Sequence, residues 1–397
     1  MRRTFAFFAA AVAIGVAVSV TGIPAQGSSD HSFVYALYGD APYGTTPTDT
    51  AEFAATPAFI DSVNADPQVS LVAQVGDIHS GKQYCTEAYD RSVAELWKAY
   101  QDPLVYLPGD NEWTDCHKAG EGGGTYDPLT QQIKYVTDPV TQQPVDYAQG
   151  NPVANLDLIR SIFYPTVGGT LGRGQKRVVS QAEVPNPVHP SDQNYVENVM
   201  WADHGVVFVT LNVPGGSNND GDIWYGAPTM SANQAAEAAA RTGADLRWLN
   251  DAFVVAGLSR AKSVMIMLQA DMWDLDGKTA AHLTGYNSIV DSIATHTSAF
   301  GKPVLLINGD SHVYRSDNPL SPTADCTTEG AGGTEVACAS ENGVHPGYDV
   351  ANFHRIVVHG STFPLEWLKM TIDPTARGTG SNAFGPFSWQ RMTQPAA

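Results

Sequence analysis

The stretch PLVYLPGD, residues 103–110, is a short apolar run that ends in a Gly-Asp pair. Three further stretches have the same form: FVYALYGD at 33–40, LVAQVGD at 71–77 and PVLLINGD at 303–310. A short run rich in Val, Leu and Tyr and stopped by glycine is typical of a strand buried on both faces. The recurrence predicts an open α/β sheet with acidic residues at its strand ends.

The four aspartates of these pairs are candidate metal ligands. Asp40, Asp77, Asp110 and Asp310 would surround one crevice, because ligands of open α/β sheets bind outside the carboxyl ends of the strands. Clustered carboxylates repel one another unless a cation lies among them. One Gly-Asp pair alone is more often a turn, since both residue types favour turns. Four pairs in the same setting favour a metal site.

Helical and strand-like patterns alternate along the rest of the chain. Helices are expected over 51–64, 87–100, 233–256 and 280–297, and strands over 205–212, 263–268, 303–308, 353–359 and 367–372. Repeated strand–helix–strand units imply a sheet layered by helices.

Two long segments break this alternation. Residues 114–190 are rich in Gly, Pro and Gln, and residues 316–348 are rich in Gly, Thr and Ala. Long loops inside a compact domain are usually functional. We expect both to be insertions over the crevice, within one domain that spans residues 27–380. A loosely held tail is expected over 381–397.

The first residues have the pattern of a secretory signal. Arg2 and Arg3 precede an apolar stretch over residues 5–20, and small and polar residues follow. We expect cleavage near Ala25, which makes residues 1–26 the signal peptide; retention as a membrane anchor is the alternative. The mature protein is therefore expected to be secreted or to lie on the exterior of the cell envelope.

The charge balance limits the partners. The formal net charge is −19, from 22 basic and 41 acidic residues. Removal of the signal takes away two arginines and no acid, so the mature chain carries −21. Such a chain has no broad basic surface for nucleic acid, and anionic lipid would repel it. A small phosphoester needs only local positive charge, which a metal pair supplies.

The four cysteines suit an exported chain. We pair Cys85 with Cys116, because each follows a Gly-Asp strand end, and Cys326 with Cys338, because both lie in one Gly-rich loop. A zinc site is the weaker alternative, since no Cys-x-x-Cys spacing is present.

Several polar residues beside these strand ends are further candidates. Asp77 is placed to bridge two metal ions, which lie about 3.5–4 Å apart in two-metal sites. His79 is either a ligand, an acid–base group or a surface residue. Glu112 either holds a neighbouring group in place or is a helix-start carboxylate. Gln269 offers an amide oxygen at a strand end.

The last Gly-Asp pair adds a histidine. Asp310 and His312 are alternate residues of an extended segment, so both side chains are expected to face the crevice. His312 is the histidine that we expect to bind metal. Arg315, three residues on, is a candidate for substrate binding, as is Asn111 beside Asp110.

The order Asp40, Gly-Asp77, Gly-Asp110-Asn-Glu and Gly-Asp310-Ser-His312 resembles the calcineurin-like metallophosphoesterase superfamily. The string LPGDNEWTDCH at 107–117 looks like an exported bacterial branch of it. The resemblance implies two facing β-sheets flanked by helices, with two divalent metals at the strand ends. It assigns as ligands Asp40, Asp77, Asp110, Gln269, Asp310 and His312.

Departures from the superfamily pattern change the expected chemistry. Pro42, Asn111 and Asp310 stand where the superfamily usually has histidines, the second of them catalytic. Oxygen ligands then dominate, which favours Mn²⁺, Mg²⁺ or Ca²⁺ over zinc or iron. Leaving-group protonation would have to come from elsewhere, such as His79 or water.

Two functions follow from this pattern. The first is a secreted metal-dependent phosphoesterase, with a phosphomonoester or phosphodiester substrate oriented by Asn111. The second is a degenerate member that keeps the fold and serves as a binding or cell-surface module.

Overall fold

The computed structural model describes residues 31–219, 221–275 and 279–393. The expected signal peptide, residues 1–26, lies outside the described residues. Within the described part of the chain, no helix has the length and apolar character that a membrane span requires.

The first sheet is built on three parallel strands. It has seven strands in the order β16-β17-β18-β15-β1-β2-β3, and β15 runs antiparallel to β1. Their bounds are β1 Phe33–Tyr38, β2 Val69–Gln74, β3 Leu104–Tyr106, β15 Glu366–Ile372, β16 Gly378–Gly380, β17 Ala383–Gly385 and β18 Phe387–Thr393. Three of the four Gly-Asp pairs therefore follow neighbouring parallel strands.

The second sheet has nine strands in the order β13-β12-β11-β14-β10-β9-β8-β7-β6. Its central strands β8, β9, β10 and β14 are parallel. The bounds are β6 Val179–Ser180, β7 Val199–Asp203, β8 Val206–Thr210, β9 Ser263–Met267, β10 Val304–Asn308, β11 Arg315–Asp317, β12 Thr327–Glu329, β13 Glu335–Ala337 and β14 Phe353–Val357. The fourth Gly-Asp pair follows β10.

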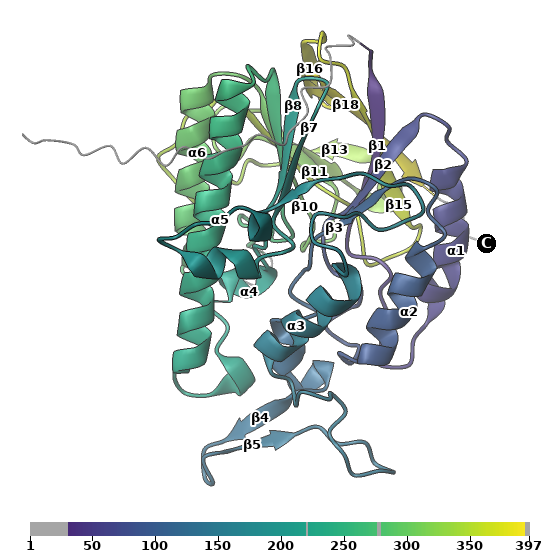
Figure 1. Ribbon diagram of the computed structural model, residues 1–397, viewed down its shortest axis with the longest axis vertical. Coiled ribbons are helices and arrows are strands. Elements are labelled where there is room, and N and C mark those ends of the chain that lie inside the picture. The colour runs from purple at the N-terminus through teal and green to yellow at the C-terminus, as the bar shows by residue number, and fades with distance from the viewer. Residues whose placement is uncertain (1–30, 220, 276–278, 394–397) are drawn as a thin grey trace, which may run out of the picture.

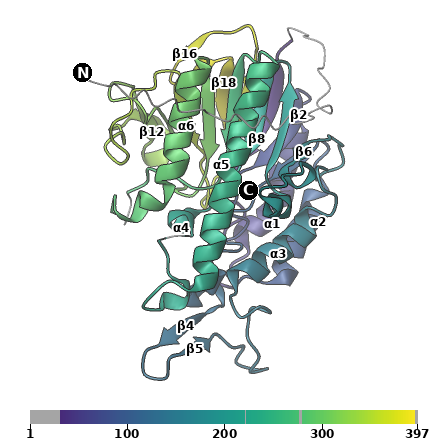
Figure 2. The ribbon, with the colours of Figure 1, turned by 60° about the vertical axis from the view of Figure 1, so that its left-hand side comes forward.

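The two sheets face each other and helices cover both outer faces (Figures 1 and 2). Side chains such as Leu37 and Val105 of the first sheet pack with Phe208 and Ile307 of the second. The outer helices are α1 Ala51–Asn64, α2 Glu87–Trp97 and α3 Pro152–Phe163 on the first sheet, and α5 Ala232–Leu258 and α6 Asn287–Phe300 on the second. The expected four-layer arrangement is confirmed.

Most expected elements are present with shifted ends. The expected helix over 280–297 instead begins as a 3-10 turn, η6 (His282–Tyr286), and α6 follows it. The expected tail is wrong: β17 and β18 occupy most of it and pair into the first sheet, with Trp389 only 2% exposed. Period-two alternation in FSWQRMT, residues 387–393, marks the strand that composition alone missed.

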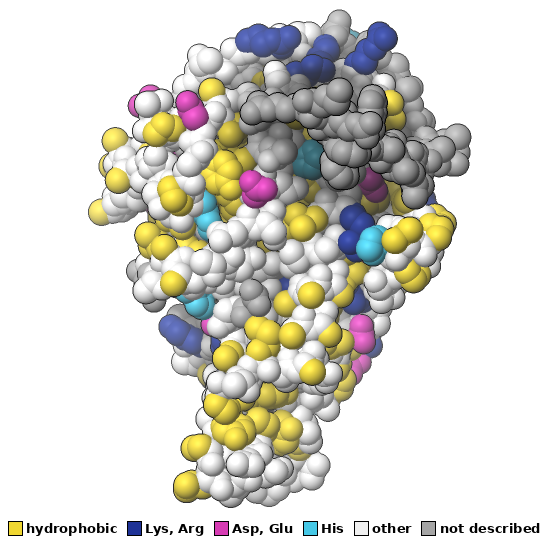
Figure 3. Space-filling model, turned by 90° about the vertical axis from the view of Figure 1, so that its left-hand side faces the viewer, with side chains coloured by type: hydrophobic (Ala, Val, Ile, Leu, Met, Phe, Trp, Pro, Cys, Tyr) yellow, Lys and Arg dark blue, Asp and Glu magenta, His cyan; other side chains and the backbone are white. Residues whose placement is uncertain are grey.

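The two expected insertions also carry regular structure. Residues 114–190 include α3 and a hairpin of β4 (Gly124–Asp127) and β5 (Gln132–Tyr135), which projects from the end of the molecule. Residues 316–348 contain most of β11 and all of β12 and β13, which extend the second sheet. Figure 3 shows hydrophobic side chains gathered over the projecting end. Short edge strands lack the buried apolar runs on which the sequence prediction relied.

Candidate metal site

The acidic strand ends of the two sheets meet in one place. Asp40 follows β1, Asp77 follows β2 and Asp310 follows β10. The Asp310 N–H donates to Asp40 Oδ1 over 3.0 Å, which ties the first sheet to the second. All three have left-handed backbones, with φ of 50°, 60° and 75°. Aspartate tolerates this conformation better than most residues, and such strain often marks functional sites.

Three of these side chains form a group that could hold a cation. Asp40, Asp77 and His312 each present one ligand atom, and the three atoms lie within 4.8 Å of one another. His312 Nε2 lies 3.7 Å from Asp40 Oδ1. Asp40 Oδ2 is buried and has no hydrogen-bond partner within the described structure. A buried carboxylate oxygen without a donor is costly unless a cation or a proton neutralises it.

Tyr43, which the sequence pattern did not single out, also belongs to this group. Its Oη donates to Asp77 Oδ2 over 2.5 Å, accepts from Asn111 Nδ2 over 2.9 Å and lies 3.3 Å from His312 Nε2. Burial and the neighbouring Asp77 raise the pKa of Tyr43 well above its usual value. The phenol is therefore protonated here and acts as a hydrogen-bond donor.

The remaining carboxylates lie beside a glycine. A Cβ on Gly215 would fall 2.3 Å from Asp110 Oδ2 and 2.8 Å from Asp310 Oδ1. The backbone after β8 thus passes too close to both carboxylates for any side chain. All four predicted aspartates are in this way brought to one place.

Gln269 has a different role from the expected one. Its Nε2 donates to Asp77 Oδ2 over 3.2 Å and to Asp110 Oδ1 over 3.0 Å. Its Oε1 accepts from the Gly215 N–H over 2.5 Å. The amide nitrogen, not the oxygen, faces the carboxylates, so Gln269 acts here as a donor between them.

Glu112 holds the two acidic loops together. Its Oε1 accepts from the Gly109 N–H over 2.7 Å, from Tyr106 Oη over 2.5 Å and from the Asp77 N–H over 3.2 Å. The sequence left open whether Glu112 holds a neighbouring group in place or is a helix-start carboxylate. These contacts show that it holds the neighbouring backbone.

The acids of the crevice are electrostatically costly. Burial raises the pKa of Asp40 well above its usual range, and the charge of Asp310 adds to the effect. Burial also raises the pKa of Asp77, followed by the charges of Asp110 and Glu112. Desolvation and like charges both disfavour the ionised form. A bound cation would remove this cost.

Two other candidates have partners other than these four carboxylates. His79 is fully buried, its Nδ1 lies 3.2 Å from the Ser80 carbonyl oxygen, and burial lowers its pKa to about 4. It is neither a surface residue nor protonated at neutral pH. Arg315 Nε pairs with Asp317 over 2.8 Å and Nη1 with Glu341 over 3.0 Å, so its guanidinium is engaged on β11.

A left-handed turn follows Gly215. Gly216, Ser217, Asn218 and Asn219 have φ of 60°, 59°, 60° and 57°. Four consecutive left-handed residues are rare, because each L-residue other than glycine costs about 1–2 kcal/mol in this conformation. The sequence signal is the run PGGSNN, residues 214–219, composed of residue types that tolerate it.

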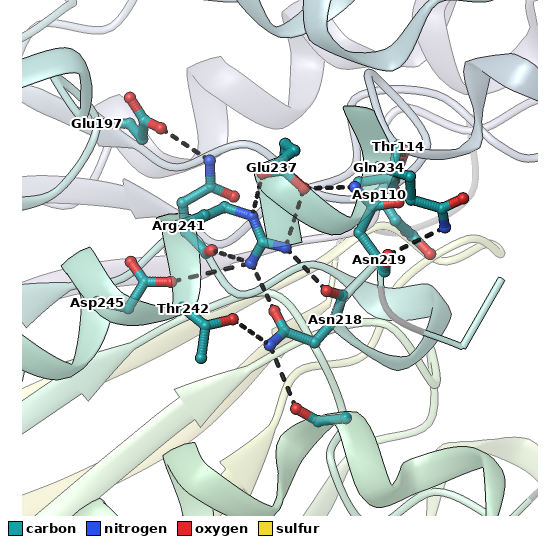
Figure 4. A network of polar contacts seen from close by, with 12 residues as sticks. Asp110, Thr114, Glu197, Asn218, Asn219, Gln234, Glu237, Arg241, Thr242 and Asp245 are labelled. Carbon is teal, nitrogen blue, oxygen red and sulfur yellow. Dashed lines mark hydrogen bonds and ion pairs between the residues drawn. The ribbon is translucent and has the colours of Figure 1, made fainter. Parts of the chain in front are cut away.

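Buried Arg241 supports this turn. Figure 4 shows its guanidinium pointing at Asn218 and Glu237. Arg241 Nη1 donates to Asn218 Oδ1 over 2.5 Å, and Nη2 donates to the Asn218 carbonyl over 2.8 Å. Asn219 Nδ2 donates to Glu237 over 2.5 Å. The turn is thus fixed from behind by α5.

The structure contains both expected disulfides, and one lies against the site. Cys85–Cys116 joins the loop after β2 to the loop after β3, with its two sulfurs 3.3 and 3.6 Å from the Asn111 carbonyl oxygen. Cys326–Cys338 closes the loop around β12 and β13.

The comparisons with known proteins add little. No protein-family model and no curated protein matches the sequence. Among solved structures, a purple acid phosphatase from yellow lupin seeds matches at 11% identity and a TM-score of 0.43. The match covers 92% of this chain and 52% of that one, so the chain spans about half the length of the phosphatase. Function must therefore be inferred from the site's own residues.

Proposed function

We propose that this protein is a secreted metal-dependent phosphoesterase that hydrolyses a phosphomonoester or phosphodiester. The observation that carries the proposal is the group Asp40, Asp77 and His312, whose ligand atoms lie within 4.8 Å of one another around an unpartnered Asp40 oxygen. Two buried carboxylates that repel each other, beside a half-buried histidine at the carboxyl ends of parallel strands, are suited to hold a divalent cation.

The donor set also indicates which cation. Asp40, Asp77, Asp110 and Asp310 supply oxygen, and His312 supplies the one nitrogen. Oxygen-rich sets of this kind favour Mn²⁺, Mg²⁺ or Ca²⁺. When bound, divalent ions held by these residues would supply a Lewis acid for a phosphoryl oxygen and an activated water.

The surrounding residues position the reactants. Asn111 Nδ2 lies at hydrogen-bond distance from both Asp77 Oδ2 and Tyr43 Oη. An amide at this place is suited to donate to a phosphate oxygen beside the acids. Glu112 and Gln269 fix the positions of the carboxylates and their loops through the hydrogen bonds described above. The site is therefore preorganised before a substrate binds.

The test is turnover of phosphoesters by the purified mature chain with Mn²⁺ or Mg²⁺. Asp77→Asn is expected to abolish both cation binding and turnover. Asp61→Asn on the exposed face of α1 is the matched control, because it makes the same substitution at a solvent-exposed position of an outer helix. An Asp77→Asn variant with an unchanged rate would falsify the proposal.

One observation favours the alternative of a non-catalytic binding module. Asp77 Oδ2 accepts hydrogen bonds from Tyr43, Asn111 and Gln269. Three donors can satisfy this carboxylate oxygen with no cation. In that case Asp77→Asn would lower the melting temperature, and the wild-type chain, even with one structural cation, would hydrolyse no ester.

A further inference from the structure

A histidine that the sequence did not single out lies at the same edge as the acids. His359 follows β14 by two residues, and β14 runs parallel to β10 with Val357 beside Asn308. It is therefore at the carboxyl edge from which Asp310 also projects.

The turn that carries His359 is bonded directly to the candidate metal site. The Gly360 N–H donates to the His312 carbonyl over 3.1 Å, and the Ser361 N–H donates to the Asp40 carbonyl over 2.7 Å. A Cβ on Gly360 would lie 2.3 Å from Asp40 Cβ. The backbone after β14 thus packs against two proposed ligands.

Both ring nitrogens of His359 face oxygen acceptors. Nδ1 lies 2.9 and 3.0 Å from the two carboxylate oxygens of Glu329, and Nε2 lies 3.3 Å from the Thr362 carbonyl. Each nitrogen therefore carries a hydrogen, which makes the ring an imidazolium. The bond to Thr362 is long, so another oxygen acceptor can replace it at small cost.

The charges around the ring sustain this state. The charged groups that act on it are Glu329 on β12, Glu366 on β15 and Glu52 on α1. Arg391 on β18 pairs with both Glu329 and Glu366. Burial opposes the charge, but the carboxylates of Glu329 and Glu366 outweigh it and raise the pKa of His359. By contrast, burial lowers the pKa of His79 and of His117 to about 4.

We propose that His359, held by Glu329, is the proton donor to the leaving group of the phosphoester; this rests on the proposed function. The bond from the leaving oxygen to phosphorus breaks while the oxygen of water forms a new one. The leaving oxygen keeps the electron pair of the broken bond and takes the Nε2 proton, which leaves a neutral imidazole. His359 regains a proton from solvent, to which the attacking water releases its own. Glu329 is a positioning residue.

This role predicts a rate loss that depends on the leaving group. General acid help is worth about 10²–10⁴-fold and matters most when the leaving oxygen is strongly basic. His359→Gln is therefore expected to lower kcat on an alkyl ester such as glycerol phosphate by about 100-fold or more. On an aryl ester such as p-nitrophenyl phosphate the loss is expected to stay below about 10-fold.

The second variant, Glu329→Gln, keeps the ring but removes its carboxylate partner. Without this carboxylate the pKa of His359 falls, so the alkaline limb of the variant's pH–rate profile on the alkyl ester is expected to move to lower pH. His296→Gln is the matched control, since His296 stacks on Phe253 between the outer helices α5 and α6. It is expected to leave both rates and the profile unchanged.

Three results overturn the inference. One is an equal loss on both esters in His359→Gln, as a structural role would give. Another is full activity of His359→Gln on the alkyl ester. If His359→Gln does not fold, a pH–rate profile of Glu329→Gln whose alkaline limb stays at the wild-type pH overturns the inference instead. A wild-type chain that hydrolyses neither ester with Mn²⁺ or Mg²⁺ removes the proposed function itself and this inference with it.

Discussion

Glycine at two positions lets the carboxylates of the crevice come together. A Cβ on Gly309 would lie 2.4 Å from Asp40 Oδ2, and one on Gly215 would lie 2.3 Å from Asp110 Oδ2. Neither distance occurs between real atoms, so any side chain would displace a proposed ligand. The backbone, as much as the acids, shapes the site.

Alanine at Gly215 is therefore expected to weaken divalent cation binding by at least about 10-fold, the scale seen when groups that orient ligands are lost. Isothermal titration with Mn²⁺ measures this. Gly257→Ala in α5 is the control, because its Cβ meets nothing within 4 Å and alanine favours a helix by about 1 kcal/mol. Equal Mn²⁺ affinity in the two variants would contradict this prediction.

The sequence predicted the acids of the site better than their partners. Asp40, Asp77 and Asp310 follow buried strands, and the parallel topology that the runs imply brings such ends together. Tyr43 meets Asp77 across 34 positions and His312 across 269. Contacts of that range depend on how the two sheets face each other, which no local pattern encodes.

One disulfide lies beside the candidate metal site and the other lies far along the chain in an edge loop, so their removal tests whether the first positions the site. Cys85–Cys116 fixes the loops that carry Asp77 and Asn111, whereas Cys326–Cys338 lies in the edge loop of the second sheet. Loss of either bridge is expected to cost about 2–4 kcal/mol of unfolding free energy. Only the first is expected also to weaken Mn²⁺ binding.

The matched variants are Cys85→Ala with Cys116→Ala, and Cys326→Ala with Cys338→Ala. Urea unfolding measures stability and titration measures Mn²⁺ affinity in both. If the two pairs lose the same affinity, or the first loses none, the Cys85–Cys116 bridge does not position the site.

Elements buried on both faces were predictable, and edge elements were not. The helix expected over 51–64 is α1, and the strand expected over 263–268 is β9 with its end moved by one residue. The expected tail was wrong because composition does not reveal β18, whose period-two alternation marks a strand. The strands β12, β13 and β17 have three residues each, and strands that short carry little pattern of their own.

At the scale of the molecule, a buried neutral histidine contributes to the response to acid. Burial lowers the pKa of His354 to about 4; the charge of Asp317 opposes this shift and the charge of Arg355 adds to it. In the unfolded chain this histidine has an ordinary pKa near 6.5, so between about pH 4 and pH 6.5 the unfolded state binds more protons than the folded state. The contribution of His354 to stability is therefore expected to fall as pH drops from about 6.5 to about 4.

His354→Gln isolates this contribution. The fall in unfolding free energy between pH 6.5 and 4 is expected to shrink by up to about 3 kcal/mol, which is 1.36 kcal/mol for each unit of pKa difference. Urea unfolding at both values measures it. An identical fall in the variant and the wild type would show that His354 titrates normally in the folded state.

The central claim is that the carboxylates after β1, β2, β3 and β10, together with His312, hold divalent cations. The most direct test is elemental mass spectrometry of the mature protein, purified without chelator or affinity metal. We predict about two divalent ions per chain, the number that a bridging carboxylate serves, with loss of both in Asp77→Asn. No bound metal, and no uptake at millimolar Mn²⁺ or Mg²⁺, would contradict the claim.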